Sequence, residues 1–257
     1  MVSKAGPSLE SHGAVIRLGI ATGFNEAYVI SPQQKDQFIA LDKKNADLIK
    51  PVIGGEDIDR YFYRSSKFLI LARNGVDVEK DHPTLVPYFD SFGKKFRERG
   101  AQGKTWLNLR ACAFFDTFKD EKVVWIELAN NGRFAYSNEE VYLLNSAIFL
   151  TPPLTLSAKS LVAILNSKLI NFYMTQISQT SGMGTKRWIK ATVKDFPIPQ
   201  RNKSNSGTFE KLELLCDARL KLGATVNSEK AQEIESRIDS TVDELYGIPE
   251  DLARHYK

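Results

Sequence analysis

Four short runs of β-branched and aromatic residues most narrow the folds that this chain can adopt. They are AFFDTF (113–118), KVVWIEL (122–128), RFAYS (133–137) and AIFLT (147–151), and polar or turn-forming residues separate them. Such runs are typical of buried strands, so the middle of the chain is expected to form a sheet. Further strands are predicted at 68–72 and within 14–31, on both sides of a loop that contains Gly19, Thr22, Gly23 and Asn25.

Two segments carry apolar residues at helical spacing. Ser157 is a suitable N-cap for a helix over 158–176, whose apolar residues repeat every three or four positions and are expected to face the core: Leu161, Leu165, Leu169 and Phe172. A second helix is expected to begin near 83–85 and to end at Gly100. A closing strand is expected over 189–199.

Two further helical runs, 208–226 and 228–246, end the chain. Ser228 can cap the second run and Gly247 can end it, and its apolar residues alternate spacings of three and four. These features predict a helical hairpin with an apolar seam.

The polar stretch 201–208 has the composition of a linker. We therefore expect an α+β fold, with a mixed sheet and packed helices in a domain over 14–200 and a C-terminal helical hairpin over 207–257.

Charge is unevenly distributed along the chain, whose net charge is +4. Residues 1–204 hold 28 Lys and Arg against 20 Asp and Glu, whereas residues 205–257 hold 7 against 11. A basic body suggests a polyanionic partner. The alternative is a solvated surface on which charges cluster by chance.

The chain lacks the residues that catalysis needs. Its histidines His12, His82 and His255 are far apart, no Cys/His cluster has zinc spacing, and no phosphate-binding glycine motif is present, so no metal site is expected. A methyltransferase acting on a base amino group needs Asn or Asp before Pro-Pro and an aromatic residue, whereas the only Pro-Pro lies in TPPLT (151–155). We expect no catalytic residue and no cofactor site in this chain.

The cysteine and hydropathy patterns indicate the cellular compartment of the protein. Cys112 and Cys216 fall in different predicted units, which argues against a disulfide framework. No apolar run reaches the roughly eighteen residues that a transmembrane helix needs, and the start of the chain has no hydrophobic signal-peptide stretch. We expect a cytoplasmic protein without a membrane partner.

Basic and amide side chains at loops and helix ends are the candidates for contact with a polyanion such as DNA, because Arg and Lys bind phosphates while Arg and Asn read base edges. The candidates come from the first loop, from the exit of the strand at 68–72, and from two basic stretches at 91–110 and 182–203. They are Thr22, Asn25, Arg73, Asn74, Lys94, Lys95, Arg97, Arg99, Lys104, Arg110, Lys186, Arg187 and Trp188.

Each of these candidates also has a purely structural interpretation. The first loop and Arg73-Asn74-Gly75 can be simple turns, the cations of 94–99 can be a solvated helix end, and Trp188 can anchor a core. For Lys186, Arg187 and Trp188 we predict a loop that faces DNA, because the preceding SQTSGMGT is polar and rich in glycine.

RLGIATGFNEAYVIS (17–31) resembles the opening motif of the TaqI-like C-terminal specificity domain. The resemblance continues in order through IKPVIGGEDIDRYFY (49–63), the helical segment after Pro83, KVVWIEL, LVAILNSKLINFYM and KDFPIP (194–199). It implies a target-recognition domain of a Type IIG restriction-modification enzyme or an adenine-specific DNA methyltransferase, similar also to Type I specificity subunits.

The resemblance further implies duplex DNA and a methyltransferase catalytic domain or subunit as partners, with S-adenosylmethionine bound by that catalytic part. Because the sequence opens directly on the motif, we expect either a fragment or a separate subunit. The alternative is a protein-interaction or assembly subunit, and adenine N6 methylation by this chain alone ranks third.

Overall fold

A central sheet explains why the middle of the chain is so apolar. The computed structural model describes residues 2–178, 185–223 and 228–256. Successive side chains of a strand point to opposite faces. In the central sheet, Val123 and Trp125 enter one hydrophobic cluster, whereas Val124 between them enters another. Both faces are therefore covered. The sheet is antiparallel and contains, in spatial order, β1 (Val15–Leu18), β9 (Ala147–Thr151), β5 (Lys122–Ile126) and β7 (Phe134–Ser137).

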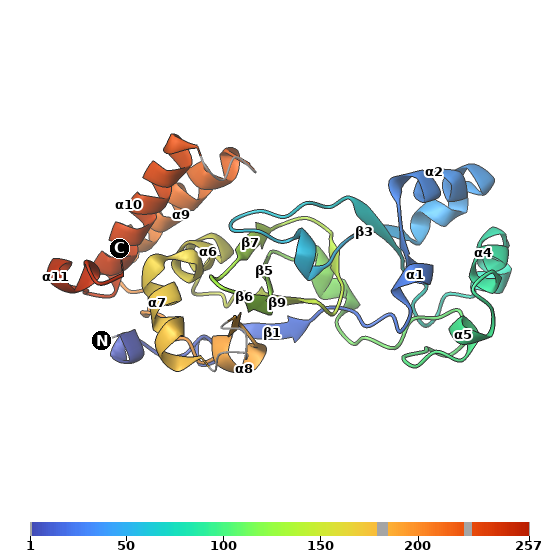
Figure 1. The fold of residues 1–257 in the computed structure, drawn as a ribbon, viewed down its shortest axis with the longest axis horizontal. Coiled ribbons are helices and arrows are strands. Elements are labelled where there is room, and N and C mark those ends of the chain that lie inside the picture. The colour runs from blue at the N-terminus through green and yellow to red at the C-terminus, as the bar shows by residue number, and fades with distance from the viewer. Residues whose placement is uncertain (1, 179–184, 224–227, 257) are drawn as a thin grey trace.

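A second, mixed sheet builds a smaller lobe at one end of the elongated molecule (Figure 1). Its strand order is β2 (Val29–Ile30), β4 (Lys67–Ile70), β3 (Ile49–Ile53) and β8 (Tyr142–Leu143); only β3 and β8 are parallel. The helices of this lobe are α1 (Asn25–Tyr28), α2 (Pro32–Leu41), α3 (Val78–Asp81), α4 (Val86–Asp90) and α5 (Gly93–Arg97), with 3-10 turns η2 (Lys43–Asp47) and η4 (Pro83–Leu85). The 3-10 turn η3 (Gly55–Asp57) lies against β5 of the central sheet.

Helices α6 (Ala158–Asn166) and α7 (Lys168–Ile177) belong to the larger lobe, where α6 packs against β5 and β7. Helices α9 (Ser206–Lys221) and α10 (Glu229–Leu245) pack against each other and against α6, at the opposite end from α2 and α4 (Figure 1). The predicted C-terminal hairpin and the α+β class are confirmed.

The hairpin shares its core with the central sheet, because Phe209 and Ile238 lie in the same hydrophobic cluster as Trp125. The predicted linker is also tied down, since Arg201 Nη1 donates to Glu213 Oε1 at 2.8 Å. Packing is thus continuous between residues 14–200 and 207–257. The division of the chain into two domains at this boundary stays a prediction.

The predicted helix over 158–176 is wrong in one respect, because it breaks at Ser167. This residue is extended (ψ 154°), and its Oγ accepts a hydrogen bond from Ile170 N and so caps α7. The break shifts the helical phase. Phe172, predicted to face the core, is therefore 38% exposed.

Four further predicted elements differ locally. AFFDTF forms a 3-10 helix, η5 (Phe115–Lys119), rather than a strand. The helix after Pro83 is divided into η4, α4 and α5, with Gly93 at a left-handed φ of 65°. The closing strand over 189–199 begins as a short helix, α8 (Lys190–Val193). The second strand within 14–31 is the two-residue β2, which follows α1 directly.

The loop between β3 and β4 joins the two lobes. Its Tyr61, at a φ of 73°, is buried, donates its N–H to Phe134 O and accepts from Tyr136 N, so the loop pairs with β7.

Within the described ranges, no helix is long and apolar enough to cross a bilayer. The remaining elements are η1 (Val2–Lys4), β6 (Leu128–Ala129), β10 (Lys186–Arg187) and α11 (Glu250–Ala253).

Candidate nucleic-acid interface

The loop after β1 forms a tight turn in which Thr22 is structural. Thr22 is buried, its Oγ1 donates to Asn25 Oδ1 at 2.6 Å, and it accepts from Phe24 N. Gly23 has a φ of 71°, and a Cβ there would lie 2.2 Å from Gly100 O, so only glycine fits this close approach. The burial of Thr22 argues against the DNA contact predicted for it, whereas Asn25 is exposed.

Asn25 and Lys95 line one polar hollow of about 470 Å³, together with Asn145 and Glu26. These side chains come from α1, from α5 and from the turn between β8 and β9. Asn25 keeps its amide N–H groups and one oxygen lone pair for a ligand, because Thr22 uses only one acceptor position. The sequence offered no sign of Asn145 beyond an Asn at a turn between two strands.

Arg99 is an internal anchor and does not belong to an exposed helix end, and its burial argues against the predicted DNA contact. The guanidinium carbon lies 5.0 Å from the centroid of the Tyr28 ring and 4.3 Å from that of the Phe96 ring. Burial lowers the pKa of Arg99, although Tyr28 opposes this effect. All five N–H donors have acceptors, which are Thr22 O, Phe96 O, Trp106 O, Asn108 O and Tyr28 Oη.

The other predicted cations of this lobe are exposed but differ in pairing. Lys94 lies 3.6 Å from Glu98. Arg97 forms an ion pair with Asp90, and its guanidinium stacks on the Trp106 ring at 3.8 Å. Three cations have no carboxylate partner among the described residues, and they are the stronger candidates for phosphate contact: Lys95, Lys104 and Arg110.

Arg73 and Asn74 leave β4 beside a second hollow of about 610 Å³. Arg73 is half-exposed and lies 3.8 Å from Asp116. Asn74 Oδ1 accepts a hydrogen bond from Lys104 N at 2.7 Å, so its side chain holds the neighbouring loop in place. Asn74 is thus partly committed to structure, and it positions Lys104.

Trp188 lies inside the larger lobe, so the prediction that it lies on an exposed loop is wrong, and its burial argues against a DNA contact. It is 0% exposed, its Nε1 donates to Ala129 O at 3.1 Å, and its carbonyl accepts from Trp125 Nε1 at 2.8 Å. Lys186 and Arg187 form the short strand β10 against β6, and Arg187 pairs with Glu127 at 2.7 Å. Burial removes the large apolar surface of the indole from water, and this stabilises Trp188 inside the lobe more than an exposed loop position could. The polar segment 179–184 before it lies outside the described residues.

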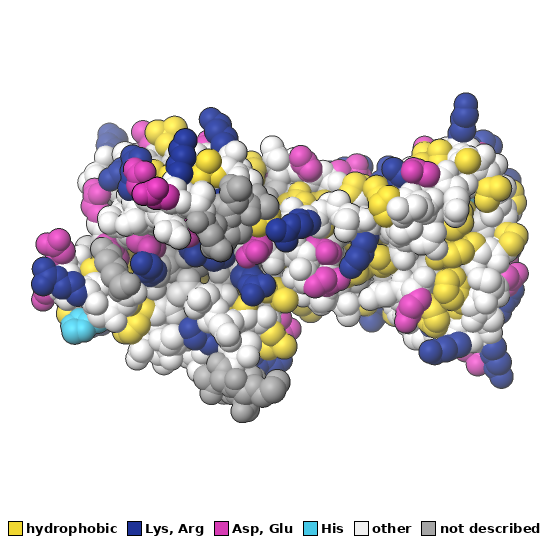
Figure 2. All heavy atoms as spheres, turned by 45° about the horizontal axis from the view of Figure 1, so that its top comes forward, with side chains coloured by type: hydrophobic (Ala, Val, Ile, Leu, Met, Phe, Trp, Pro, Cys, Tyr) yellow, Lys and Arg dark blue, Asp and Glu magenta, His cyan; other side chains and the backbone are white. Residues whose placement is uncertain are grey.

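The charged surface is mixed on the face that Figure 2 shows. Lys and Arg side chains are interspersed with Asp and Glu along the length of the molecule and do not form one basic stripe. Individual unpaired cations should therefore matter more for phosphate binding than the net charge of the body. No group of three or more metal-ligating side chains occurs in residues 2–178, 185–223 or 228–256.

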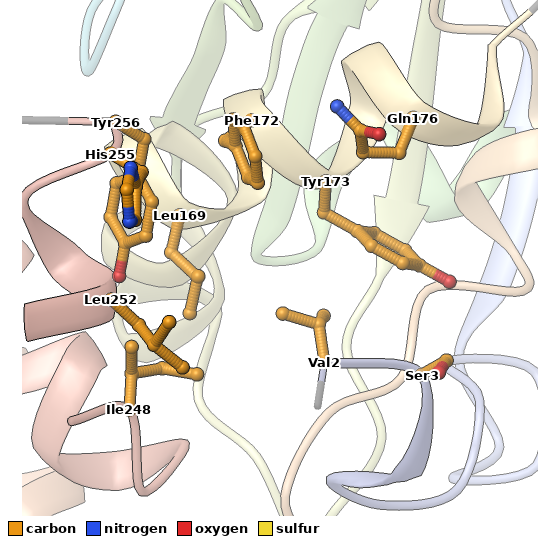
Figure 3. A pocket seen from close by; sticks show the side chains of 10 residues that line it. All are labelled: Val2, Ser3, Leu169, Phe172, Tyr173, Gln176, Ile248, Leu252, His255 and Tyr256. Carbon is orange, nitrogen blue, oxygen red and sulfur yellow. The ribbon is translucent and has the colours of Figure 1, made fainter.

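An apolar groove lies at the far end of the larger lobe, between η1, α7 and α11 (Figure 3). Leu169, Phe172 and Leu252 line it, as do Ile248 and Tyr256. Among the described residues, its lining contains no Lys or Arg. This apolar groove therefore does not suit a phosphate backbone and does not belong to the candidate interface.

The comparisons with known proteins agree with this fold. The model of the TaqI-like C-terminal specificity domain matches residues 50–198, which begin after the opening motif at 17–31. No curated protein matches the chain.

Two solved structures have a similar fold. One is the Type IIL restriction-modification enzyme MmeI in complex with DNA, with a TM-score of 0.67 and 15% identity, covering 96% of this chain and 33% of that one. The other is the type IIG restriction endonuclease BpuSI, with a TM-score of 0.50 and 11% identity, covering 93% of this chain and 32% of that one. This chain thus spans about a third of the length of each. Since the family model covers more than half of its residues, the chain belongs to the family of TaqI-like C-terminal specificity domains.

Proposed function

We propose that this chain recognises a specific duplex DNA sequence as the specificity domain of a restriction-modification enzyme or an adenine-specific DNA methyltransferase. The family match over residues 50–198 is the observation that carries this proposal. Methyl transfer then belongs to another domain or subunit, which binds S-adenosylmethionine. The two cysteines are unpaired, which suits the reducing cytoplasm that we propose for the protein.

The polar hollow at Asn25 has the chemistry for base contact. An Asn amide offers a donor and an acceptor that match the adenine edge in the major groove, and a nearby ammonium suits a guanine or a phosphate. Asn25 supplies the amide, while Lys95 beside it and the exposed Lys104 and Arg110 are suited to neighbouring phosphates.

Selection from a pool of random duplexes, followed by a salt titration of the selected sequence, tests this function. We expect enrichment of one sequence and a steep fall of affinity with salt, because phosphate contacts release counterions. Failure to bind duplex DNA even at low salt would instead favour the alternative of a protein-interaction subunit.

Two substitutions should separate base contact from phosphate contact. Asn25→Ala is expected to cost about 1 to 3 kcal/mol of discrimination at one base pair, because a base-edge contact is lost. Lys95→Ala should weaken binding to all sequences and lower the salt slope by about one. Lys94→Ala is the matched control, since Glu98 already lies beside that ammonium. If Lys94→Ala and Lys95→Ala weaken DNA binding equally, the polar hollow at Asn25 does not belong to the interface.

The purified chain is expected to transfer no methyl groups from S-adenosylmethionine to mixed duplex DNA. The reason is that TPPLT (151–155) lacks the Asn or Asp and the aromatic residue that hold a flipped base. Radiolabel incorporation is measured against a reaction without protein. Transfer above that background would show that this chain carries a catalytic site of its own.

A further inference from the structure

A second polar hollow of about 360 Å³ lies in the larger lobe, and its walls come from segments far apart in the sequence. Arg60 enters from the loop that joins the lobes, Asn131 from the turn after β6, Lys168 from the start of α7 and Lys186 from β10. Ligand pockets in proteins hold about 300 to 1,000 Å³, so this hollow suits a small group.

Positive charge is in excess at this hollow. Arg60 lies 2.9 Å from Glu235, a carboxylate that it shares with Arg219, and Lys168 has only a long contact of 3.8 Å with Asp239. Lys186 has no carboxylate partner among the described residues, and partial burial lowers the pKa of its ammonium. Among the described residues, the lining of the hollow holds three cations and no carboxylate, so an anion would suit the site.

Hydrogen bonds hold part of the wall of this hollow in place. Asn166 donates to Phe134 O at 2.7 Å and accepts from Phe134 N at 3.1 Å. Asn171 Oδ1 accepts from Gly132 N at 2.7 Å. These bonds fix the backbone on both sides of Arg133 and leave the neighbouring Asn131 amide exposed. A preformed site binds its ligand without the cost of ordering its loops.

We infer that this hollow binds one phosphate group of the DNA backbone, with Lys186 and the Asn131 amide as donors and Lys168 turning from Asp239 towards the same group. The inference rests on the proposed DNA-binding function and adds a second contact region, in the larger lobe. A phosphate accepts hydrogen bonds from ammonium and amide groups on several sides, which fits donors that converge from different segments. Arg187 takes no part, because its guanidinium pairs with Glu127.

The test compares Lys186→Gln with Arg187→Gln, two neighbouring cations of one strand, in the full chain. Affinity for a mixed-sequence duplex is measured between about 50 and 200 mM salt. We expect Lys186→Gln to weaken binding about five- to tenfold near 0.1 M salt and to lower the salt slope by about 0.9, as loss of one phosphate contact does. Arg187→Gln should stay within about twofold of the unmodified chain, because its charge is already paired.

Two further variants test whether a change in the salt slope reflects the charge at this hollow and not a folding defect. Lys186→Arg should retain the salt slope, and Lys168→Gln combined with Lys186→Gln should lower it again. Equal effects of Lys186→Gln and Arg187→Gln would overturn the phosphate site while leaving the proposed function intact. Absence of DNA binding by the unmodified chain would overturn both. Tighter binding of RNA than of duplex DNA would overturn the choice of ligand.

Discussion

Replacing Arg99 with methionine is expected to lower the free energy of unfolding by at least about 3 kcal/mol, because buried acceptors lose a charged donor that satisfies all of them. The guanidinium joins the first loop, through Thr22 O, to the segment that contains Trp106 and Asn108. Methionine fills much of the same volume but donates nothing. Urea unfolding followed by circular dichroism measures the change.

Arg97→Met is the matched control for this experiment. It lies two residues away on the same basic segment, but its side chain is about half exposed and pairs with Asp90 at the surface. Exposed ion pairs contribute about 0 to 1 kcal/mol, so the control should unfold near the unmodified midpoint. If both variants lose the same stability, Arg99 does not anchor the lobe.

Glu235→Gln should destabilise the protein by about 3 kcal/mol, because its carboxylate is shared by two arginines and one of them is fully buried. Glu235 Oε1 accepts from Arg219 Nε at 2.7 Å, and its Oε2 lies 2.9 Å from Arg60 Nη1. Arg219 is 0% exposed and lies over the Tyr61 ring. Neutralising the carboxylate leaves the charge of Arg219 uncompensated, and it also loosens the loop that joins the lobes.

Glu233→Gln, on the exposed face of the same helix, is the control for Glu235→Gln. It makes the same chemical change without a buried partner, and surface substitutions usually stay within about 0.5 kcal/mol. A difference between the two variants below about 1 kcal/mol would mean that Arg219 is stabilised in another way, since a broken buried pair costs more.

Local sequence patterns predicted the elements whose stability depends on residues near in sequence. The strands at 122–128, 133–137 and 147–151 and the two C-terminal helices follow from the runs of apolar residues and from their spacing. The prediction failed at Ser167, because a cap in the middle of a helical pattern looks like one more helical residue until its backbone is seen to be extended.

The candidate site was only partly predictable, because its contacts join residues that are far apart in the sequence. The sequence by itself determined which side chains carry charge, which segments are basic and which family the chain resembles. Only the tertiary structure decided that Lys95 and Lys186 line polar hollows while Arg99 and Trp188 are buried. Burial and pairing depend on partners distant in the chain, such as Tyr28 for Arg99, and no spacing along the chain encodes those contacts.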